Sequence, residues 1–338
     1  MKIIITLSVL LSGIATSTVA YPKPGETWKV LPNITLGSRQ EHTTVALGTD
    51  VYILGGLVPP VDSAVDPTSN IVQSYSIAHN TWSSETPMPR ALNHLNAAVV
   101  NGKIYVLGGL AVGPGAWPNW LAAGDCWVYS PRQKIWEILA NMPNGTERGS
   151  AAVGVYGDTI YLAGGLTRLG ISGQTTVTTV NAYCTRTNTW STLESLPEKR
   201  DHAGSAVVGR IFYVVGGRIN GEPSGMRDTV LAFDVSVEKG SWSTRAGKMP
   251  TARGGLSASA VGHTIYAFGG EGNVATSTGV FNQTEAYNTK TDTWTSLKPM
   301  VLPRHGTSAA AVGGRVYIPG GGIQQQLGGT DYFDVFKL

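Results

Sequence analysis

The sequence has few cysteines, no excess of charge of either sign and, after its first twenty residues, no long hydrophobic run. Among 338 residues only Cys126 and Cys184 could form a disulfide. When residues 1–20 are set aside, 24 basic residues stand against 22 acidic ones, so nothing in the charge balance calls for nucleic acid or an anionic membrane as a partner. No later stretch approaches eighteen uninterrupted apolar residues, so we expect no membrane span and a soluble mature protein.

The first twenty residues have the composition of a secretory signal. They carry one lysine, Lys2, then an apolar run and a small-residue end at Ala20, and they are too short to span a membrane. We therefore expect the mature chain, residues 21–338, to be secreted or held in the lumen of the secretory pathway. Three acceptor sequences for N-linked glycans fit surface connections in such a compartment. They begin at Asn33, Asn144 and Asn282.

What the sequence does contain is a repeat. Six Gly-Gly pairs, each at the end of an apolar strand, return with gaps of 51 to 56 residues, and a tryptophan returns in step with gaps of 52 to 54. A period near fifty residues with four strands per unit predicts an all-β fold, a β-propeller of six blades. The glycine pairs begin at Gly55, Gly108, Gly164, Gly216, Gly269 and Gly320, and the tryptophans are Trp28, Trp82, Trp136, Trp190, Trp242 and Trp294.

These residues resemble kelch repeats, in which the glycine pair, a spaced aromatic residue and the tryptophan define one blade. The resemblance covers essentially the whole mature chain. The last unit ends at Leu338 without a tryptophan strand, and the strand that it lacks stands at the other end of the chain, around Trp28. We therefore expect residues 26–31 to complete the sixth blade and close the ring, which leaves no exposed edge strand.

The two cysteines both fall in third strands, in neighbouring units. Secretion favours a disulfide between them. Equivalent strands of neighbouring blades are far apart, however, and side chains on rotationally equivalent faces do not point at each other. This geometry favours two buried thiols over a disulfide.

An arginine stands sixteen residues before the first glycine in five of the six units, and Leu92 takes that position in the second unit. We expect these six residues to ring the mouth of the central channel, where ligand sites gather. An arginine fork would bind a carboxylate, enolate or quinone-type oxygen. Alternatively, each arginine pairs with a backbone carbonyl or a carboxylate between blades, with Glu41, Glu147, Glu198 and Asp201 as candidates. The arginines are Arg39, Arg148, Arg200, Arg253 and Arg304.

Four of the six histidines lie within three residues of the same position. They could donate a hydrogen bond to a carbonyl or act as a general acid, or they could simply be turn residues. We expect no metal ion, because they come from different blades without ligand-type spacing and no cysteine or carboxylate cluster joins them. The four are His42, His94, His202 and His305.

The loop after the second glycine pair carries two tryptophans outside the repeat, Trp117 and Trp120. They could form a lid or wall over the channel mouth, or pack down on their own blade. An apolar rim over an arginine- and histidine-lined floor would suit a small hydrophobic substrate with a few oxygens. Because Leu92 belongs to the same unit, we expect the ligand on this side of the mouth.

Size, signal, blade number and pocket character are similar to those of fungal kelch-type hetero-Diels–Alderases of polyketide–terpenoid secondary metabolism. This resemblance implies an enzyme without a cofactor, which orients a quinone methide against a terpene alkene and stabilises the developing oxyanion. The alternative is a non-catalytic secreted module for glycan or protein ligands. On the first interpretation the catalytic candidates are Arg200, Arg304, His94, His202 and His305, and the ligand-binding candidates are Arg39, Leu92, Arg148, Arg253, Trp117 and Trp120.

Overall fold

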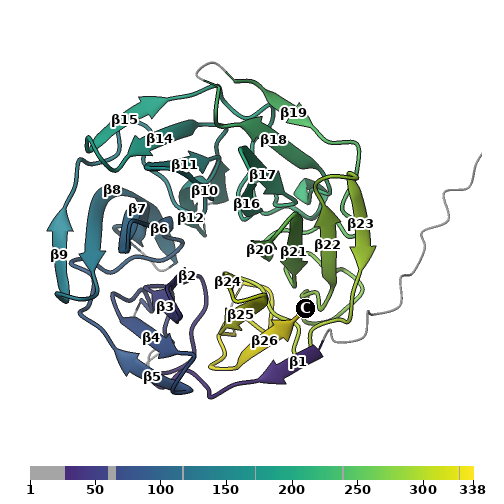
Figure 1. The fold of residues 1–338 in the computed structure, drawn as a ribbon, viewed down its shortest axis with the longest axis horizontal. Helices are drawn as coiled ribbons and strands as arrows, with labels where there is room; N and C mark the ends of the chain where they lie inside the picture. Colours follow the sequence, from purple (N-terminus) through teal and green to yellow (C-terminus); the bar gives the residue numbers. More distant parts are fainter. Residues whose placement is uncertain (1–26, 60–65, 116–117, 172, 238–239, 327) are drawn as a thin grey trace, which may run out of the picture.

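A computed structural model describes residues 27–59, 66–115, 118–171, 173–237, 240–326 and 328–338. The expected signal at residues 1–20 and the loop residue Trp117 lie outside the described residues. Six antiparallel sheets stand around a central axis as the blades of a propeller, which confirms the predicted fold (Figure 1). Apart from strands, the described chain contains the short 3₁₀ helix η1 (Pro223–Gly225). No helix within these ranges is long and apolar enough to cross a membrane.

Each blade has four strands, with the first strand nearest the axis (Figure 1). Blade 1 consists of β2 (Thr43–Leu47), β3 (Asp50–Leu54), β4 (Val72–Ser76) and β5 (Thr81–Ser84). Blade 2 consists of β6 (Ala97–Val100), β7 (Lys103–Val112), β8 (Asn119–Ser130) and β9 (Ile135–Ile138). Blade 3 consists of β10 (Ala152–Tyr156), β11 (Thr159–Ala163), β14 (Val180–Cys184) and β15 (Thr189–Thr192).

The second half of the chain repeats the arrangement. Blade 4 consists of β16 (Gly204–Val208), β17 (Ile211–Val215), β18 (Val230–Asp234) and β19 (Trp242–Thr244). Blade 5 consists of β20 (Ser257–Val261), β21 (Thr264–Phe268), β22 (Thr284–Asn288) and β23 (Thr293–Ser296). Blade 6 consists of β24 (Ala310–Val312), β25 (Arg315–Pro319), β26 (Phe333–Lys337) and β1 (Thr27–Val30). The N-terminal strand therefore completes the last blade, as predicted, with Trp28 opposite Phe336.

The repeated tryptophans join neighbouring blades. Every one of the six indole nitrogens donates a hydrogen bond to a backbone carbonyl of the preceding blade, over 2.9 to 3.2 Å. For Trp28 the acceptor is Lys298, 270 residues away, so the ring is closed by this bond as well as by the β1–β26 ladder. The apolar strands pack blade against blade, and side chains such as Val51 and Ile53 are fully buried.

The glycine pairs also serve the contact between blades. The first glycine has a left-handed backbone, and at Gly164 a Cβ would collide with the carbonyl oxygen of Arg200 in the connection to the next blade. The N–H of Gly165 donates to that same carbonyl over 2.7 Å. The pair is thus a docking point at which one strand end meets the chain that leads into the following blade.

Cys126 lies in β8 and Cys184 at the end of β14, the third strands of blades 2 and 3. Both are free thiols, Cys126 buried and Cys184 half-buried. The expectation of two thiols rather than a disulfide therefore agrees with the structure, although only one of them is fully buried.

Candidate ligand-binding site on the propeller axis

Six residues, one before each innermost strand, form a closed ring of backbone hydrogen bonds around the axis. Each N–H donates to the carbonyl of the equivalent residue one blade earlier, over 2.6 to 3.4 Å, and the sixth residue returns to the first. All six have a left-handed backbone, with φ between 49° and 62°. We call them the axial ring: Glu41, His94, Ser150, His202, Gly255 and Gly306.

The axial ring carries large polar side chains at positions that favour glycine. A left-handed backbone is free of strain for Gly255 and Gly306 but costs about 1–3 kcal/mol for a residue with a Cβ. Strain of this kind gathers at functional sites, where the side chain is needed in that place. At Gly306 a Cβ would meet the Glu41 carboxylate, which would have to move aside. The axial ring is therefore the first candidate for function.

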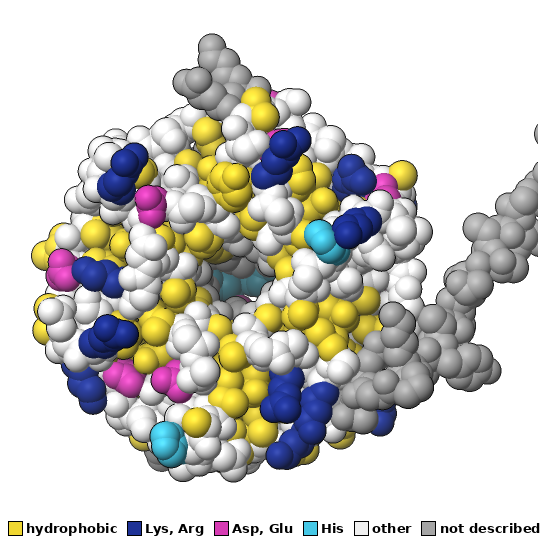
Figure 2. All heavy atoms as spheres, viewed as in Figure 1, with side chains coloured by type: hydrophobic (Ala, Val, Ile, Leu, Met, Phe, Trp, Pro, Cys, Tyr) yellow, Lys and Arg dark blue, Asp and Glu magenta, His cyan; other side chains and the backbone are white. Residues whose placement is uncertain are grey.

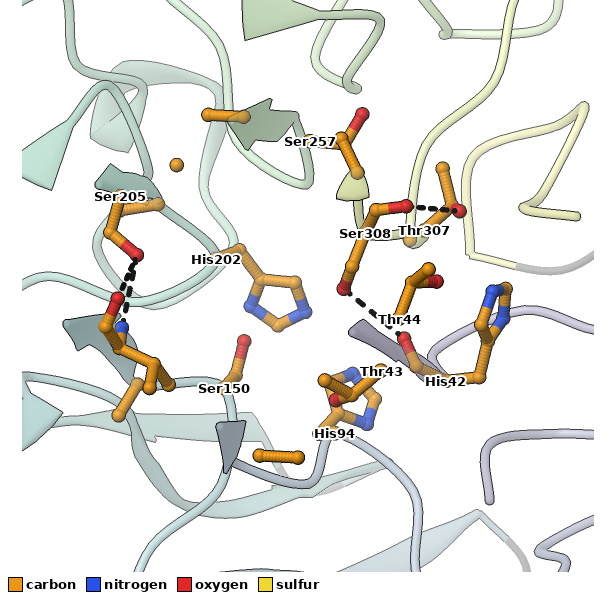
Figure 3. Close-up of a pocket in the computed structure, with 18 of the residues that line it drawn as sticks. His42, Thr43, Thr44, His94, Ser150, His202, Ser205, Ser257, Thr307 and Ser308 are labelled. Carbon is orange, nitrogen blue, oxygen red and sulfur yellow. Dashed lines mark hydrogen bonds between the residues drawn. The ribbon is translucent and has the colours of Figure 1, made fainter. Parts of the chain in front are cut away.

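Two cavities meet at the axial ring. One, of about 260 Å³, is the central channel; the inner strands line it, largely with alanine, serine and threonine (Figure 3). The other, of about 500 Å³, lies among the loops that follow the glycine pairs, and we call it the cup. Glu41, His94 and His202 line both. They form the partition between channel and cup. Figure 2 shows one face of the molecule hollowed at its centre, with histidine at the base of the hollow.

The Glu41 carboxylate stands among three histidines. Its Oε2 lies 3.2 Å from His94 Nε2 and 3.8 Å from His202 Nε2, and its Oε1 lies 3.8 Å from His305 Nδ1. The rings of His94 and His202 meet edge to face with centroids 4.9 Å apart. The side chains of all three histidines are at most 3% exposed, and that of Glu41 is 10% exposed.

Arg218 and two further carboxylates continue this cluster on the side of blades 4 and 5. Arg218 forms an ion pair with Glu271, and its Nε lies 3.2 Å from Asp201 Oδ1. Its Nη2 lies 3.3 Å from His202 Nε2. Asp201 Oδ1 in turn lies 2.6 Å from His202 Nδ1.

The partners of His94 and His202 fix how each ring is protonated. Nδ1 of His94 lies 2.6 Å from Asn93 Oδ1. The side-chain amide nitrogen of Asn93 donates a hydrogen bond to the hydroxyl oxygen of Thr68, so Oδ1 is the atom that faces His94. Nδ1 of His202 faces the Asp201 carboxylate, which can only accept. Nδ1 therefore carries a proton in both rings. Nε2 of His202 faces Nη2 of Arg218, which can only donate, so this nitrogen presents a lone pair. Burial, acting against the attraction of Glu41, lowers the pKa of His94 to about 4, so this ring is neutral near pH 7.

The carboxylates of the cluster are ionised. Desolvation alone would raise the pKa of Glu271, but Arg218, His305 and His202 together outweigh it and bring the pKa down to about 2. The pKa values of Glu41 and Asp201 are also lowered, because neighbouring histidines, and for Asp201 also Arg218, outweigh the desolvation that would raise them. The floor of the cup is thus a buried, charged cluster.

The wall of the cup on the side of blades 1 to 3 is apolar. The extended start of β8 pairs with the hairpin of β12 (Leu166–Gly170) and β13 (Gly173–Thr176), so Trp120 stands opposite Leu169. Trp120 is 5% exposed, packs against Leu57 and Leu166, and donates through its indole nitrogen to Asp66 and Thr68. It lines the cup as well. Trp120 is thus part of the wall of the cup. It packs on the neighbouring blades 1 and 3 through Leu57 and Leu166, and not on its own blade alone.

The expectation that the repeated arginines ring the channel mouth is wrong. All five side chains are at most 1% exposed and none lines the channel or the cup. Four donate to the carbonyl of the glycine sixteen residues later, as Arg148 does to Gly164 over 2.7 Å. Their side chains end on partners inside the fold: Gln73 for Arg39, Asn181 for Arg148, Glu198 for Arg200, Glu285 for Arg253 and Asp334 for Arg304.

Leu92 is not a ligand contact either, since it is fully buried and lines neither cavity. Its blade also differs at the arginine partner, because Trp127 stands opposite Val106 in β7 where Gln73 stands opposite Ile53 in blade 1, and Trp127 and Leu92 belong to one apolar cluster. An apolar residue replaces arginine where the partner is apolar too. The exception that the sequence shows in the second unit is therefore a packing difference.

The histidines divide into two groups. His94, His202 and His305 reach the cup as expected. His42 lines only the channel, and burial, helped by Arg39, lowers its pKa to about 3, so it is neutral at all but acidic pH.

Two charged residues that sequence reasoning missed, Arg218 and Glu271, directly follow glycine pairs. This position holds Leu57, Leu110 and Leu166 in blades 1 to 3, and Arg218, Glu271 and Gly322 in blades 4 to 6. The repeat itself contained the signal, because this position is leucine in three units and charged in two. Glu41 was considered only as a partner for arginine, and it belongs to the axial ring instead. The expectation that no carboxylate joins the histidines is therefore wrong.

The glycan acceptor residues lie where the sequence placed them. Asn33 follows β1 and Asn144 follows β9, and both are exposed, whereas Asn282 stands half-buried two residues before β22.

Comparison with known proteins adds the family. Residues 146–321 match the KLHDC2/KLHL20/DRC7 Kelch-repeats domain, and residues 38–89 and 92–143 each match the Kelch motif. The chain is 43% identical over 324 residues to Kelch-like protein terF of Aspergillus terreus, covering 94% of this chain and 69% of that protein. It is 29% identical over 246 residues to Kelch-like protein 36 of Rattus norvegicus, of which it covers 37%.

A solved structure, that of YjhT, superposes with a TM-score of 0.70 at 15% identity, covering 91% of this chain and 95% of YjhT. This similarity concerns the fold alone. Together with the glycine, arginine and tryptophan contacts that recur from blade to blade, the matches over most of the chain show that this protein belongs to the kelch-repeat family.

Proposed function

We propose that the cup binds a small, largely apolar molecule that carries a few oxygens, and that the protein promotes a reaction of this molecule, a hetero-Diels–Alder cycloaddition. One observation carries the proposal: an apolar wall built from blades 1 to 3 faces a charged floor and wall built from blades 4 to 6, within one cavity of about 500 Å³. A cavity of this size, mostly apolar with a few polar groups, is typical of small-molecule sites.

The donor to the ligand is Arg218 and not one of the repeated arginines, and the histidines are acceptors and not the expected donors. Arg218 can donate to a carbonyl oxygen in the cup, because it lines the cavity and carries a permanent charge. Nε2 of His94 and of His202 can accept a proton or a hydrogen bond from a hydroxyl group, since each presents a lone pair. A substrate with both a carbonyl and a phenolic or enolic hydroxyl would satisfy all of them.

Such a site would favour cycloaddition through placement and charge. A quinone methide offers four atoms, C=C–C=O, and an alkene offers two; one C–C and one C–O bond form, and no atom leaves. The apolar wall around Trp120 and Leu169 would hold the alkene against the diene, which removes the entropy of bringing them together. Arg218 would stabilise the negative charge that gathers on the oxygen as the bonds form.

The test is incubation of the purified protein with a quinone methide precursor and a macrocyclic terpene alcohol. We expect faster adduct formation than in buffer and a single stereoisomer. Trp120→Phe should keep the fold and change the ratio of stereoisomers. An unchanged rate and isomer ratio would contradict catalysis, and saturable binding of either reactant without acceleration would favour a non-catalytic binding module.

We also propose that the protein enters the secretory pathway and carries glycans. The signal-like residues 1–20 and the exposure of Asn33 and Asn144 support this. Expression in a eukaryotic secretory host, followed by mass measurement before and after N-glycosidase treatment, tests it. Retention of the mass expected for residues 1–338 would contradict the proposal.

A further inference from the structure

We propose that Glu41, His94 and His202 form a binding site for one divalent cation of the zinc class on the propeller axis, between the channel and the cup. The ligand atoms are Nε2 of each histidine and a carboxylate oxygen of Glu41. These three atoms lie within 4.8 Å of one another. The inference goes beyond the proposed function and does not depend on it; an ion bound there takes the Nε2 lone pairs of His94 and His202 in place of a substrate hydroxyl, and Arg218 still lines the cup.

The spacing of the atoms fits a first-row divalent ion. Zinc binds imidazole nitrogen and carboxylate oxygen at about 2.0–2.2 Å, so two ligands of one tetrahedral ion stand about 3.3 Å apart. Glu41 Oε2 is 3.2 Å from His94 Nε2 and 3.8 Å from His202 Nε2. Small side-chain movements suffice to place an ion between them.

The hydrogen bonds behind the two histidines are those that metal-binding histidines have. Such residues donate their second ring N–H to a carboxylate or carbonyl oxygen, which orients the ring and keeps the ligating nitrogen free. Nδ1 of His202 is held in this way by Asp201, and Nδ1 of His94 by Asn93, each over 2.6 Å. Asp201 is itself held by Gln174 and Thr176.

The excess of negative charge in the cluster also favours the binding of a cation. Among the described residues around the cup floor, the three carboxylates of Glu41, Asp201 and Glu271 face the single guanidinium of Arg218. The carboxylates therefore outnumber the guanidinium by two. Buried carboxylates without a counter-charge are costly, and one divalent ion would balance these two.

The Nε2 lone pair of His202 accepts a hydrogen bond from Arg218, and this bond must break when an ion binds. The Nη2 atom of the arginine is 3.3 Å from His202 Nε2, which is a long hydrogen bond, whereas Glu271 and Asp201 hold the rest of the guanidinium. An ion can therefore take the lone pair without releasing the ion pairs of Arg218.

A second observation points to a missing partner at the same place. His305 is 1% exposed, and its Nδ1 has no hydrogen-bond partner although it faces Glu41 and Glu271 at 3.8 and 3.5 Å. Nε2 of this ring lies 2.9 Å from the carbonyl oxygen of Gln324, so Nδ1 is the ring nitrogen left without a partner. A water on the ion would supply one. Three protein ligands leave such open positions, and these face the two cavities.

The experiment measures cation binding directly, without a substrate. Protein stripped with a chelator and dialysed near pH 7 is titrated with Zn²⁺ by calorimetry, and with Co²⁺ by visible absorption. We expect one ion per chain and cobalt bands of a four- or five-coordinate site. We expect Zn²⁺ to raise Tm.

The variants use residues that the chain itself places in the axial ring. His94→Gly and His202→Gly copy Gly255 and Gly306, so the left-handed backbone is kept, and Glu41→Gln keeps the size of its side chain. Each should weaken Zn²⁺ binding by at least about a hundredfold. The control is His79→Ala with His263→Ala, which removes two exposed histidines and should leave the stoichiometric site unchanged.

Two results would overturn the proposal. One is that the unaltered protein takes up no stoichiometric Zn²⁺, which needs no variant to interpret. The other is that a Zn²⁺ site persists in folded axial-ring variants or disappears in the control. Neither result bears on the cycloaddition assay, so the two proposals can fail separately.

Discussion

Trp28 donates its indole N–H to the carbonyl oxygen of Lys298, and this single bond joins the start of the described chain to blade 5 across 270 positions. The same ring packs against Phe268 and Phe336, with centroids 5.6 and 5.1 Å away. Strand β1 thus links blade 6 to blade 5 and helps to hold the ring of blades closed.

Trp28→Ala should therefore lower the free energy of unfolding by about 3 kcal/mol, since it removes a large aromatic contact and a hydrogen bond. Trp28→Phe should recover most of this loss, because only the hydrogen bond, about 1 kcal/mol, is missing. Urea unfolding monitored by circular dichroism measures both. If Trp28→Ala matched the unaltered protein, ring closure would not depend on this contact.

Replacing a repeated arginine should destabilise the fold according to the charge of its partner. Arg304→Ala leaves the fully buried Asp334 without its counter-charge and should cost about 3–5 kcal/mol. Arg39→Ala should cost less, because its partner Gln73 is neutral. Chemical unfolding of the two variants makes the comparison, and an equal loss would show that the backbone contacts dominate.

The Arg304→Ala variant should also recover stability in acid. Burial already raises the pKa of Asp334 although Arg304 opposes it, and loss of Arg304 raises that pKa further. A carboxyl whose pKa is higher in the folded than in the unfolded state binds more protons when folded, so stability falls as pH rises between the two values. The deficit of the variant should therefore shrink from pH 7 towards pH 5, and a constant deficit would contradict this cause.

Ser150→Gly should stabilise the protein by about 1 kcal/mol. Ser150 occupies the axial ring at φ 51°, where Gly255 and Gly306 adopt the same backbone without strain. Ser83→Gly, in strand β5, is the matched control and should destabilise by about 0.5–1 kcal/mol, because glycine weakens an extended strand. Tm shifts of opposite sign are expected; a fall in both would mean that the Ser150 side chain makes a larger contribution than its backbone strain.

An acidic residue on the rim of the cup should weaken the binding of apolar ligands without affecting the fold. Ile171 lines the cup and is 73% exposed, so Ile171→Asp should reduce affinity for the probe 1-anilinonaphthalene-8-sulfonate about tenfold at unchanged Tm. Val274→Asp replaces an apolar residue outside the cup that is also largely exposed, and should have no effect. Fluorescence titration decides; equal effects of the two would place the probe elsewhere.

The two thiols should react at very different rates in the folded protein. Burial raises the pKa of Cys126 to about 12, so it is protonated at pH 8, while hydrogen bonds from Thr187 lower the pKa of the half-buried Cys184. A thiol reagent at pH 8 should modify one residue quickly and two after denaturation. Cys184→Ser should abolish the fast phase; rapid reaction at two positions would contradict the burial of Cys126.

The architecture follows from the sequence because its determinants repeat. Each glycine pair and each tryptophan makes the same contact in every blade, so six copies report one geometry. Even the missing tryptophan after Gly321 could be supplied by Trp28. The position of Arg148 was also found correctly, sixteen residues before Gly164, but its direction was not. A repeat shows that residues are equivalent and does not show whether they point to solvent, to a cavity or into the fold.

The candidate site was found only in part, because its members lie far apart in the sequence. Glu41, His94 and His202 come from the connections into three different blades, and only the ring geometry places them on one axis. Counting two residues beyond the arginine position would have revealed them as a set of four polar residues followed by two glycines. The role of Glu41 could not be read from its neighbours in the chain.

The axial ring has a further consequence for the evolution of the binding site. Its hydrogen bonds join backbone groups only, so they do not depend on which side chain stands at each position. Glycine at two of the six positions shows that the ring forms without a side chain there. The side chains beneath a ligand can therefore be substituted one blade at a time without a change in the propeller fold.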